Sequence, residues 1–415
     1  MKKKILTSLL VAASLIGVTS CGNEEENVSS SSESSQALAS SEATSSSENS
    51  QSSDYSINIY DVDGLLLNSY TFDANSEKSA YELLLENADV KLFGTYINSI
   101  DSSYEDYNYY LALYVNDEYS MVGFDQLEAQ AGDVIDFKVT CWNDSFSEND
   151  IKLDIALHQY VRDHLGSRIL SETFSDAMND YWTYAGLQFI DEVDAYSINP
   201  TLRSDAETYD LNKLIDTDYF KYYSVASALG ADLSDLRTAY TAYLETISTD
   251  YEELKTPFIV GPAQAFNISS SKIDALINTT DIPSIKGSYE WDGVTYEYTN
   301  DAYFWYYILE SLYGNETSNE VLKTIANTEY DNAATLSLAI STFAAANKSI
   351  TDSALYNEGV DSLLEQILSY YDEDLNLIKY SQYDTGVNMS TNQIYTNLFA
   401  YKKQRNTNTA QNIFA

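Results

Sequence analysis

The chain has 415 residues, of which 64 are acidic and 22 are basic, giving a net charge of −42 at pH 7. This charge excludes functions that depend on attracting nucleic acid or an anionic lipid surface. The length allows two or three domains, and two cysteines, Cys21 and Cys141, are too few for a disulfide framework.

The N-terminus has the form of a secretory signal. Three lysines follow Met1, and a mostly apolar stretch runs from Ile5 to Val18. This stretch is shorter than the roughly 20 residues that a membrane-spanning helix needs. It ends Val18-Thr19-Ser20-Cys21, which resembles a bacterial lipobox. The resemblance implies that Cys21 is lipidated and becomes the mature N-terminus, so that residues 1–21 are the signal and lipidation site. An ordinary signal peptide with a chance cysteine is the alternative.

Residues 22–53 form a tract with 14 Ser, six Glu and no Lys or Arg. Such a composition provides no apolar face to bury, so we expect it to stay disordered. A flexible coil of this length spans about 30 Å. The tract is therefore interpreted as a tether that holds the folded domains away from the membrane.

Residues 54–145 predict a small α+β domain with a β-grasp-like fold. Apolar and polar residues alternate on both sides of Asp63-Gly64, and an Asp-Gly pair between two such stretches is typical of a β-hairpin turn. A serine-capped stretch at 76–89 predicts a helix, and strands are expected at 110–117 and before Trp142. Cys141 is expected to be buried in the last strand. The order strand, strand, helix, strand, strand supports this fold class.

Residues 150–408 have a helical hydrophobic period with weak self-similarity, which predicts an all-α helical-repeat domain. A short β-hairpin with an Asp-Gly turn is expected at 288–298. Helices are predicted at 151–165, 167–182, 184–196, 209–230, 234–248, 257–267, 269–279, 301–313, 318–329, 332–347, 354–372 and 390–405.

Segments in both halves resemble known families. The stretches FGTYINSI (93–100), LYVN (113–116) and AGDVI (131–135) resemble the transcobalamin-like β domain of the DUF4430 type, which occurs in cobalamin carriers and bacterial surface lipoproteins. The stretches DNAAT (331–335) and NMSTNQ (388–393) are similar to helix starts in the α/α-toroid of the terpenoid-cyclase and prenyltransferase superfamily. In the carriers the two domains hold a corrinoid between them, but their order is the reverse of the order here.

The sequence predicts no enzyme activity and no metal site. Prenyltransferases of the toroid fold bind zinc through Asp, Cys and His. Here His158 and His164 lie about 240° apart on a helix and cannot share one metal, and the helical half has no cysteine. Cyclase D-x-D-D, G-x-S-x-G and Walker motifs are absent. A glycosidase-type carboxylate pair stays open, because acidic residues occur throughout the chain.

A toroid leaves a concavity at the starts of its inner helices, and ligand pockets combine apolar walls with a few polar groups. Each candidate has a structural alternative: Asp331 and Ser390 are common N-cap types, and the aromatic residues can be core or cross-strand packing. The residues expected to contact a ligand are Tyr222, Tyr303, Trp305, Asp331, Thr335, Asn388, Ser390 and Gln393, with Tyr114 from the β domain.

These features predict a lipid-anchored protein on the extracellular face of a bacterial membrane. We expect it to bind a small molecule, such as a corrinoid or another vitamin, between the β domain and the toroid and to present it to a membrane transporter. No cofactor is expected besides such a cobalamin-like ligand. The alternative is a non-catalytic adhesion or interaction protein. Binding predicts an aromatic and amide-lined cavity between the domains, whereas adhesion predicts a filled toroid and an exposed apolar patch.

Overall fold

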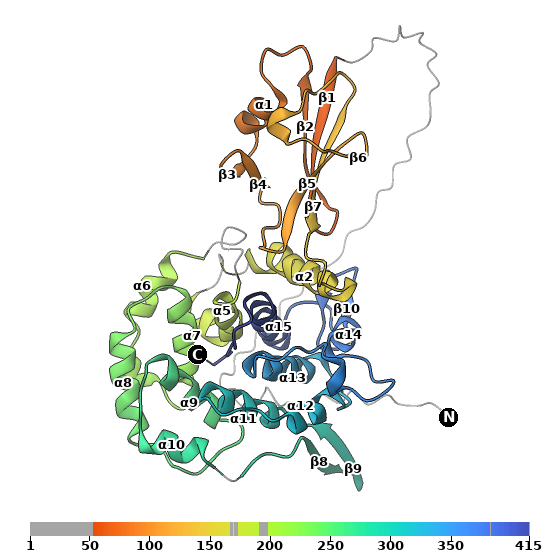
Figure 1. Ribbon diagram of the computed structural model, residues 1–415. Helices are drawn as coiled ribbons and strands as arrows, with labels where there is room; N and C mark the ends of the chain where they lie inside the picture. Colours follow the sequence, from red (N-terminus) through yellow and green to blue (C-terminus); the bar gives the residue numbers. More distant parts are fainter. Residues whose placement is uncertain are drawn as a thin grey trace, which may run out of the picture.

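The computed structural model describes residues 53–166, 169, 173–190, 198–279, 281–381 and 383–414. The predicted signal, Cys21 and nearly all of the tether lie outside the described residues. A small sheet domain at residues 54–141, called the β domain below, is followed by a largely helical region (Figure 1). Within the described part of the chain, no helix combines the length and apolarity needed to cross a bilayer.

The β domain is built on a mixed sheet with the strand order β2-β1-β7-β5-β6. Its first and last strands pair in parallel at the centre, with Ile57 opposite Ile135, as expected for a β-grasp-like fold. The predicted hairpin at Asp63-Gly64 is confirmed, because β1 and β2 pair antiparallel. The strands of this sheet are β1 (Asp54–Tyr60), β2 (Leu66–Asp73), β5 (Tyr109–Val115), β6 (Glu118–Tyr119) and β7 (Val134–Cys141).

One face of this sheet forms the core of the β domain. Alternate residues such as Ile57, Leu111 and Phe137 are buried there together with Leu84 of helix α1 (Ala80–Asn87). Ser79 caps α1. An additional hairpin, β3 (Val90–Phe93) and β4 (Tyr96–Ile100), was not predicted as strands. Cys141 packs against the core but is only partly buried, because it is the last residue of β7.

The helical region is organised around a closed ring of helices. Successive members of the ring contact each other, and the last member contacts the first (Figure 1). Small residues permit the close approach of neighbours: a Cβ atom at Gly186 would lie 2.9 Å from the hydroxyl oxygen of Thr396. The ring helices are, in contact order, α5 (Tyr181–Leu187), α7 (Asp218–Ala228), α9 (Thr256–Ala265), α11 (Asp301–Leu312), α13 (Ala333–Ala345) and α15 (Met389–Thr407).

The remaining helices flank the ring (Figure 1). Helix α2 continues into a π-helical turn at Val161–Leu165, and the predicted hairpin is present as β8 (Lys286–Trp291) and β9 (Val294–Thr299). The short pair β10 (Tyr371–Asp372) and β11 (Leu377–Ile378) was not predicted. The flanking helices are α2 (Glu148–Tyr160), α4 (Phe174–Asn179), α6 (Thr201–Glu207), α8 (Ser234–Leu244), α10 (Ser271–Ile277), α12 (Asn319–Ala326) and α14 (Leu363–Leu368).

Some predicted helix boundaries are wrong. The helix expected from residue 209 begins at Asp218, because Asp216 adopts a left-handed backbone with φ of 46°. The helix expected at 354–372 is reduced to α14, and Gly359, with φ of 81°, interrupts the chain before it. Helix α6 was not predicted at all. The helices expected at 167–182 and 184–196 lie partly outside the described residues.

Candidate functional site

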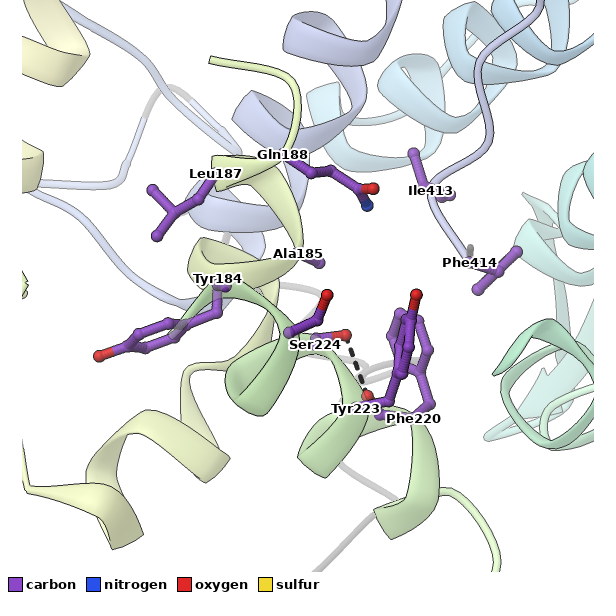
Figure 2. Close-up of a pocket in the computed structure, with 11 residues that line it drawn as sticks. Tyr184, Ala185, Leu187, Gln188, Phe220, Tyr223, Ser224, Ile413 and Phe414 are labelled. Atoms are coloured by element: carbon purple, nitrogen blue, oxygen red, sulfur yellow. Dashed lines mark hydrogen bonds between the residues drawn. The ribbon is translucent and has the colours of Figure 1, made fainter. Parts of the chain in front are cut away.

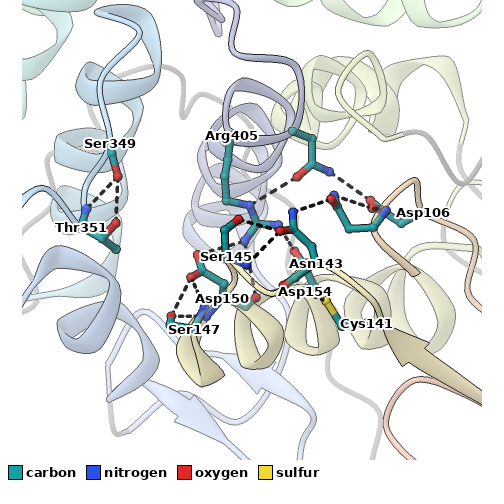
Figure 3. A network of polar contacts seen from close by, with 12 residues as sticks. Asp106, Cys141, Asn143, Ser145, Ser147, Asp150, Asp154, Ser349, Thr351 and Arg405 are labelled. Carbon is teal, nitrogen blue, oxygen red and sulfur yellow. Dashed lines mark hydrogen bonds and ion pairs between the residues drawn. The ribbon is translucent and has the colours of Figure 1, made fainter. Parts of the chain in front are cut away.

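The β domain is joined to the helical region through buried charges. Arg405, near the end of α15, places Nη2 2.6 Å from Oδ1 of Asp154 on α2, and Tyr109 of β5 donates a hydrogen bond of 2.9 Å to Oδ2 of the same carboxylate. Asp154 has no exposed surface, and its burial raises its pKa although Arg405 lies beside it. Figure 3 shows Arg405 beside Asp154 and Asp150, and its Nη1 lies 3.3 Å from Oδ1 of Asp150. Three elements from both domains therefore meet at one carboxylate.

A second pair of contacts extends this network along α15. The ammonium group of Lys402 lies 3.2 Å from Oδ2 of Asp106 and donates a hydrogen bond of 2.7 Å to the hydroxyl of Tyr104. Asn406, one turn further along, also donates to Asp106. Burial alone would raise the pKa of Asp106, but the charge of Lys402 and the hydrogen bonds from Lys402 and Asn108 together outweigh it and lower the pKa. The last turns of α15 are thus fastened to the loop that precedes β5.

A third cluster holds the β1–β2 turn against α2. Nε2 of His158 lies 2.7 Å from Oδ2 of Asp61, and Nη1 of Arg162 lies 3.1 Å from the same oxygen. The backbone N–H of Tyr104 donates to Oδ1 of Asp61, and Arg162 also pairs with Asp63 at 2.9 Å. Burial pushes the pKa of Asp61 upward, but these hydrogen bonds and the charge of His158 hold it below its usual value.

Side chains therefore occupy the contact between the domains at the positions where a ligand was predicted to lie. Two hollows in the described part of the chain lie elsewhere. One, of about 230 Å³, is lined by α5, α7 and the C-terminal segment, and another, of about 300 Å³, lies between α8 and α9. Neither has a residue of the β domain in its lining.

An aromatic belt runs around part of the ring interior. Trp182 of α5 packs edge-on against Phe220 of α7, Phe220 packs against Phe258 of α9, and Phe258 packs against Trp305 of α11, with ring centroids 5.1–5.9 Å apart. Phe414 of the C-terminal segment contacts both Phe220 and Phe258. Neighbouring ring helices thus contribute one large aromatic side chain each to a continuous apolar wall.

The inward side of α15 follows from its contacts. The ring of Tyr395 stacks on Tyr160 of the flanking helix α2, with centroids 3.8 Å apart, so this side of α15 faces away from the ring interior. On either flank, the hydroxyl of Thr396 donates to the carbonyl oxygen of Trp182 on α5, and Nδ2 of Asn397 donates to Oγ of Ser337 on α13. The side opposite Tyr395, between these flanks, therefore faces inward.

This inward side carries three amide side chains. Gln393, Asn397 and Gln404 are spaced four and seven residues apart, which places them on one helical face. All three are buried, and Nε2 of Gln393, Oδ1 of Asn397 and Oε1 of Gln404 have no hydrogen-bond partner among the described residues. A buried polar atom without a partner destabilises a protein by about 1–3 kcal/mol, and native structures contain few of them. We call these three residues the amide stripe.

Trp305 adds a fourth unpaired polar atom to the ring interior. Its indole is 7% exposed, and its Nε1–H finds no acceptor in the described part of the chain. Trp305 belongs to the aromatic belt through its contact with Phe258 of α9. In the contact order of the ring, α9 lies opposite α15. The ring interior therefore combines apolar surfaces with unpaired donors and acceptors, which is the composition of a small-molecule pocket.

The hollow of about 230 Å³ lies beside this belt. Figure 2 shows that Gln188, Tyr223 and Ser224 approach it from α5 and α7, while Ile413 and Phe414 form the wall on the other side. The hydroxyl of Ser224 already donates a hydrogen bond to the carbonyl oxygen of Phe220. The hollow is thus bounded partly by the chain's own C-terminal residues.

A half-buried carboxyl group lies where two neighbouring ring helices begin. Oδ1 of Asp301, the first residue of α11, accepts a hydrogen bond of 2.7 Å from the hydroxyl of Thr335 on α13. Burial raises the pKa of Asp301 to about 6, and the hydrogen bond from Thr335 opposes this only in part. Asp301 was not among the residues predicted to contact a ligand, whereas its partner Thr335 was.

The residues predicted as ligand contacts occupy varied positions. Trp305 and Gln393 face the ring interior. Asn388 is exposed and caps α15, and the N-cap of α13 is Asn332 rather than the exposed Asp331. Ser390 is half-buried in the first turn of α15. No ligand contact of these residues is tested, so their role in binding stays a prediction.

The predicted aromatic contacts are all engaged in packing. The hydroxyl of Tyr222 donates to the carbonyl oxygen of Ala206, and the ring of Tyr303 packs against Phe304 and Tyr307. On the β domain, the ring of Tyr114 meets Tyr119 edge-on, and Nζ of Lys138 lies 4.9 Å from its centroid. Tyr114 is therefore part of the sheet face that points away from the core.

The histidines have structural partners. His158 bonds to Asp61, and Nε2 of His164 lies 3.0 Å from the carbonyl oxygen of Leu375. In the described ranges, no group of three or more His, Cys, Asp or Glu side chains is arranged to hold a metal ion.

Asn397, Gln404 and the aromatic residues Phe220, Phe258 and Phe414 were not predicted from the sequence. The spacing of Gln393, Asn397 and Gln404 was a readable signal, because amides at intervals of four and seven residues share a helical face. The C-terminal segment carried no comparable signal.

Comparison with known proteins identifies one part of the chain. Residues 71–140 match the family described as Domain of unknown function (DUF4430), and this range runs from β2 to β7. The match supports the resemblance of the β domain to the transcobalamin-like family. No curated protein and no solved structure matches the chain.

Proposed function

We propose that this protein is a lipid-anchored extracellular binding protein that holds a small organic molecule inside its ring of helices. Acylated Cys21 and the Ser-rich tether attach it to the membrane, and the β domain is docked firmly on α2 and α15. The proposal places the ligand within the ring rather than between the domains. It involves no chemical step, and presentation of the ligand to a membrane transporter would follow release.

The observation that carries this proposal is the set of unpaired polar atoms around the ring interior. Among the described residues, Nε1 of Trp305 and Nε2 of Gln393 are donors without acceptors, and Oδ1 of Asn397 is an acceptor without a donor. A ligand carboxylate would accept hydrogen bonds from the two donors, and a ligand amide N–H would pair with Oδ1 of Asn397, while the aromatic belt would enclose the apolar part of the ligand. Ordered water is the competing occupant, since buried water usually makes about three such hydrogen bonds.

A corrinoid is a less suitable ligand in this arrangement. The hollow of about 230 Å³ beside the aromatic belt, whose lining includes none of the unpaired polar atoms, is smaller than the roughly 300–1,000 Å³ of pockets that hold drug-sized molecules. A macrocycle would require the C-terminal segment to leave or the ion-paired domains to separate. Vitamins and metabolites with one ring and one acidic group fit the proposal better.

A thermal-shift screen of the protein lacking residues 1–21 tests the proposal. A ligand at 100 times its Kd should stabilise the protein by about 2.7 kcal/mol. Gln393→Leu nearly keeps the side-chain volume, Trp305→Phe keeps an aromatic ring in the smaller side chain, and each removes a donor, so both should fold and lose most of the ligand-induced shift. Gln264→Leu, at an exposed position of α9, is the matched control. A shift that survives both substitutions unchanged would place the ligand elsewhere.

Adhesion is a second candidate, favoured by the exposed apolar residues of the β domain. Phe93, Tyr107 and Met121 are 81–90% exposed. Large apolar side chains in water are typical of interaction surfaces when they gather in one patch. Binding of the protein to immobilised matrix proteins or glycans that is lost in Phe93→Ser and Met121→Ser, and retained in Gln393→Leu, would support this function instead.

A further inference from the structure

The C-terminal segment, Gln411–Phe414, turns back from α15 into the ring of helices. Figure 1 shows the C-terminus inside the circle of ring helices. The backbone N–H of Gln411 donates to the carbonyl oxygen of Ala344 on α13, and Nδ2 of Asn412 donates to the carbonyl oxygen of Ile308 on α11, both at 3.1 Å. The segment is not helical, and it leaves α15 through Asn408, whose φ of 51° is left-handed.

Phe414 fills a site in the ring that is shaped for an aromatic group. Its side chain has no exposed surface, and its ring lies 5.6 Å from that of Phe220 and 5.3 Å from that of Phe258. A Cβ atom at Gly261 of α9 would lie 2.5 Å from Cβ of Phe414, so glycine is required for this contact. Glycine in a helix interior is unfavourable, so the packing of Phe414 must compensate for it.

The segment also forms a wall of the neighbouring hollow. Ile413 and Phe414 line the space of about 230 Å³ together with Tyr223 and Gln188 (Figure 2). If the segment withdrew, the volume of these two apolar side chains would be added to the hollow. The resulting space would be bounded by the aromatic belt, and its polar partners would be Nε1 of Trp305 and the amide stripe of α15.

We propose that Phe414 is an internal competitor for the ligand of the ring. The ligand then belongs to a definite class: it presents a phenyl-sized flat apolar group to Phe220 and Phe258, and an oxygen or amide group to Trp305 or the amide stripe. This inference rests on the proposed function, since it assumes that the ring interior is the binding site. The C-terminal segment occupies the site until such a ligand displaces it.

Competition of this kind has a measurable consequence. The apparent affinity of a ligand is reduced by the fraction of molecules whose site is free. If the segment is docked in 99% of molecules, removing it should strengthen binding about 100-fold. A gain of at least tenfold is the expected result for Phe414→Ala.

The experiment is a fluorescence titration with 8-anilinonaphthalene-1-sulfonate, which carries flat aromatic rings and an anionic oxygen group. The protein lacking residues 1–21 is compared with Phe414→Ala, with Asn412→Ala and with Gly261→Leu. Asn412→Ala loosens the segment without opening a cavity and should give an intermediate gain. Gly261→Leu expels Phe414 but fills its place, so it should give no gain. Tyr383→Ala, an aromatic residue 63% exposed, is the control.

Two further measurements separate competition from loss of packing. Near-ultraviolet circular dichroism must show fixed aromatic packing in each variant, because this dye also binds partly unfolded proteins. Hydrogen exchange should show that the ligand speeds exchange of the Phe414 amide, which donates to Oδ1 of Asn412 at 2.8 Å in the docked state. Neither the circular dichroism spectrum nor the exchange rate of the Phe414 amide is derived from a measured binding affinity.

The outcomes distinguish this inference from the proposed function. Equal affinity of the wild-type protein and a folded Phe414→Ala variant, with binding still lost in Gln393→Leu, would overturn the competitor role and leave the ring site intact. Binding that no substitution in the ring alters would overturn both. A tenfold or larger gain in Phe414→Ala, absent in Gly261→Leu and accompanied by faster exchange at Phe414, would support competition.

Discussion

The guanidinium group of Arg405 lies 2.6 Å from the carboxylate of Asp154, a side chain with no exposed surface. The two residues are 251 positions apart in the sequence, and Tyr109 of the β domain donates to the same carboxylate. This contact joins the C-terminal helix, the first flanking helix and the sheet of the β domain, so we expect the two domains to unfold together.

Removing the cation should therefore destabilise the whole protein. Arg405→Met leaves Asp154 buried without its charge partner, which should lower the free energy of unfolding by about 3–5 kcal/mol. Urea denaturation followed by circular dichroism measures this change. The double variant Arg405→Met/Asp154→Leu should recover part of the loss, because the fully buried carboxylate is gone, although Asp150 loses its contact with Arg405 and Tyr109 loses its acceptor.

Lys78→Met is the matched control for Arg405→Met. Lys78 pairs with Glu86, and both side chains are 52% exposed, so this change should lower stability by less than about 1 kcal/mol. If Arg405→Met and Lys78→Met have the same small effect, the buried network does not stabilise the contact between the domains.

Asp61 should make stability depend on pH in the acidic range. Its folded-state pKa lies below its usual value, because the bonds to His158, Tyr104 and Val62 outweigh burial. Its contribution is therefore fully present above about pH 4 and is lost as the pH falls through the lowered pKa. Asp61→Asn should cost about 3 kcal/mol at pH 7 and progressively less below pH 4, measured by urea unfolding. A constant difference across this range would contradict this assignment.

Asp301 should have the opposite pH dependence. Its pKa is raised to about 6 by burial, so the folded state favours the protonated carboxyl. The stability from this group is fully present below about pH 4 and is lost as the pH rises through 6. Asp301→Asn should therefore increase the free energy of unfolding at pH 8 by up to about 3 kcal/mol and change it little at pH 4. A higher melting temperature at pH 8 than that of the wild-type protein measures this gain.

The control for Asp301→Asn is Asp331→Asn, at an exposed position beside the same pair of helices. It should show no comparable rise at pH 8. A variant Asp301→Asn that is less stable than the wild-type protein at pH 8 would show that the ionised carboxylate is favourable at the start of α11.

The predicted lipidation of Cys21 is tested by replacing this cysteine with serine. Each buried methylene of an acyl chain contributes about 0.8 kcal/mol, and two chains anchor a protein stably. The wild-type protein should incorporate labelled palmitate and partition into a detergent phase, whereas Cys21→Ser should do neither. Incorporation of label into Cys21→Ser would refute the predicted attachment site.

The local elements were largely predictable because their signals are local. The alternation around Asp63-Gly64 predicted the first hairpin, the Asp-Gly turn near residue 292 predicted the second, and the Ala-rich run at 332–347 predicted the fully buried helix α13. Helix ends were less predictable, because single residues with left-handed backbones, such as Asp216, end or delay a helix that composition alone would continue.

The sequence by itself indicated the two-part architecture and the strongly negative net charge, and the predicted membrane attachment rests on it alone, because hydrophobic period, net charge and a lipobox-like motif are properties of composition and of neighbouring residues. Only the tertiary structure decided that Arg405 meets Asp154, that the amide stripe faces the aromatic belt, and that Phe414 enters the ring. Each of these contacts joins residues remote in the chain. Such contacts depend on how helices and sheet pack in three dimensions, which no local pattern specifies.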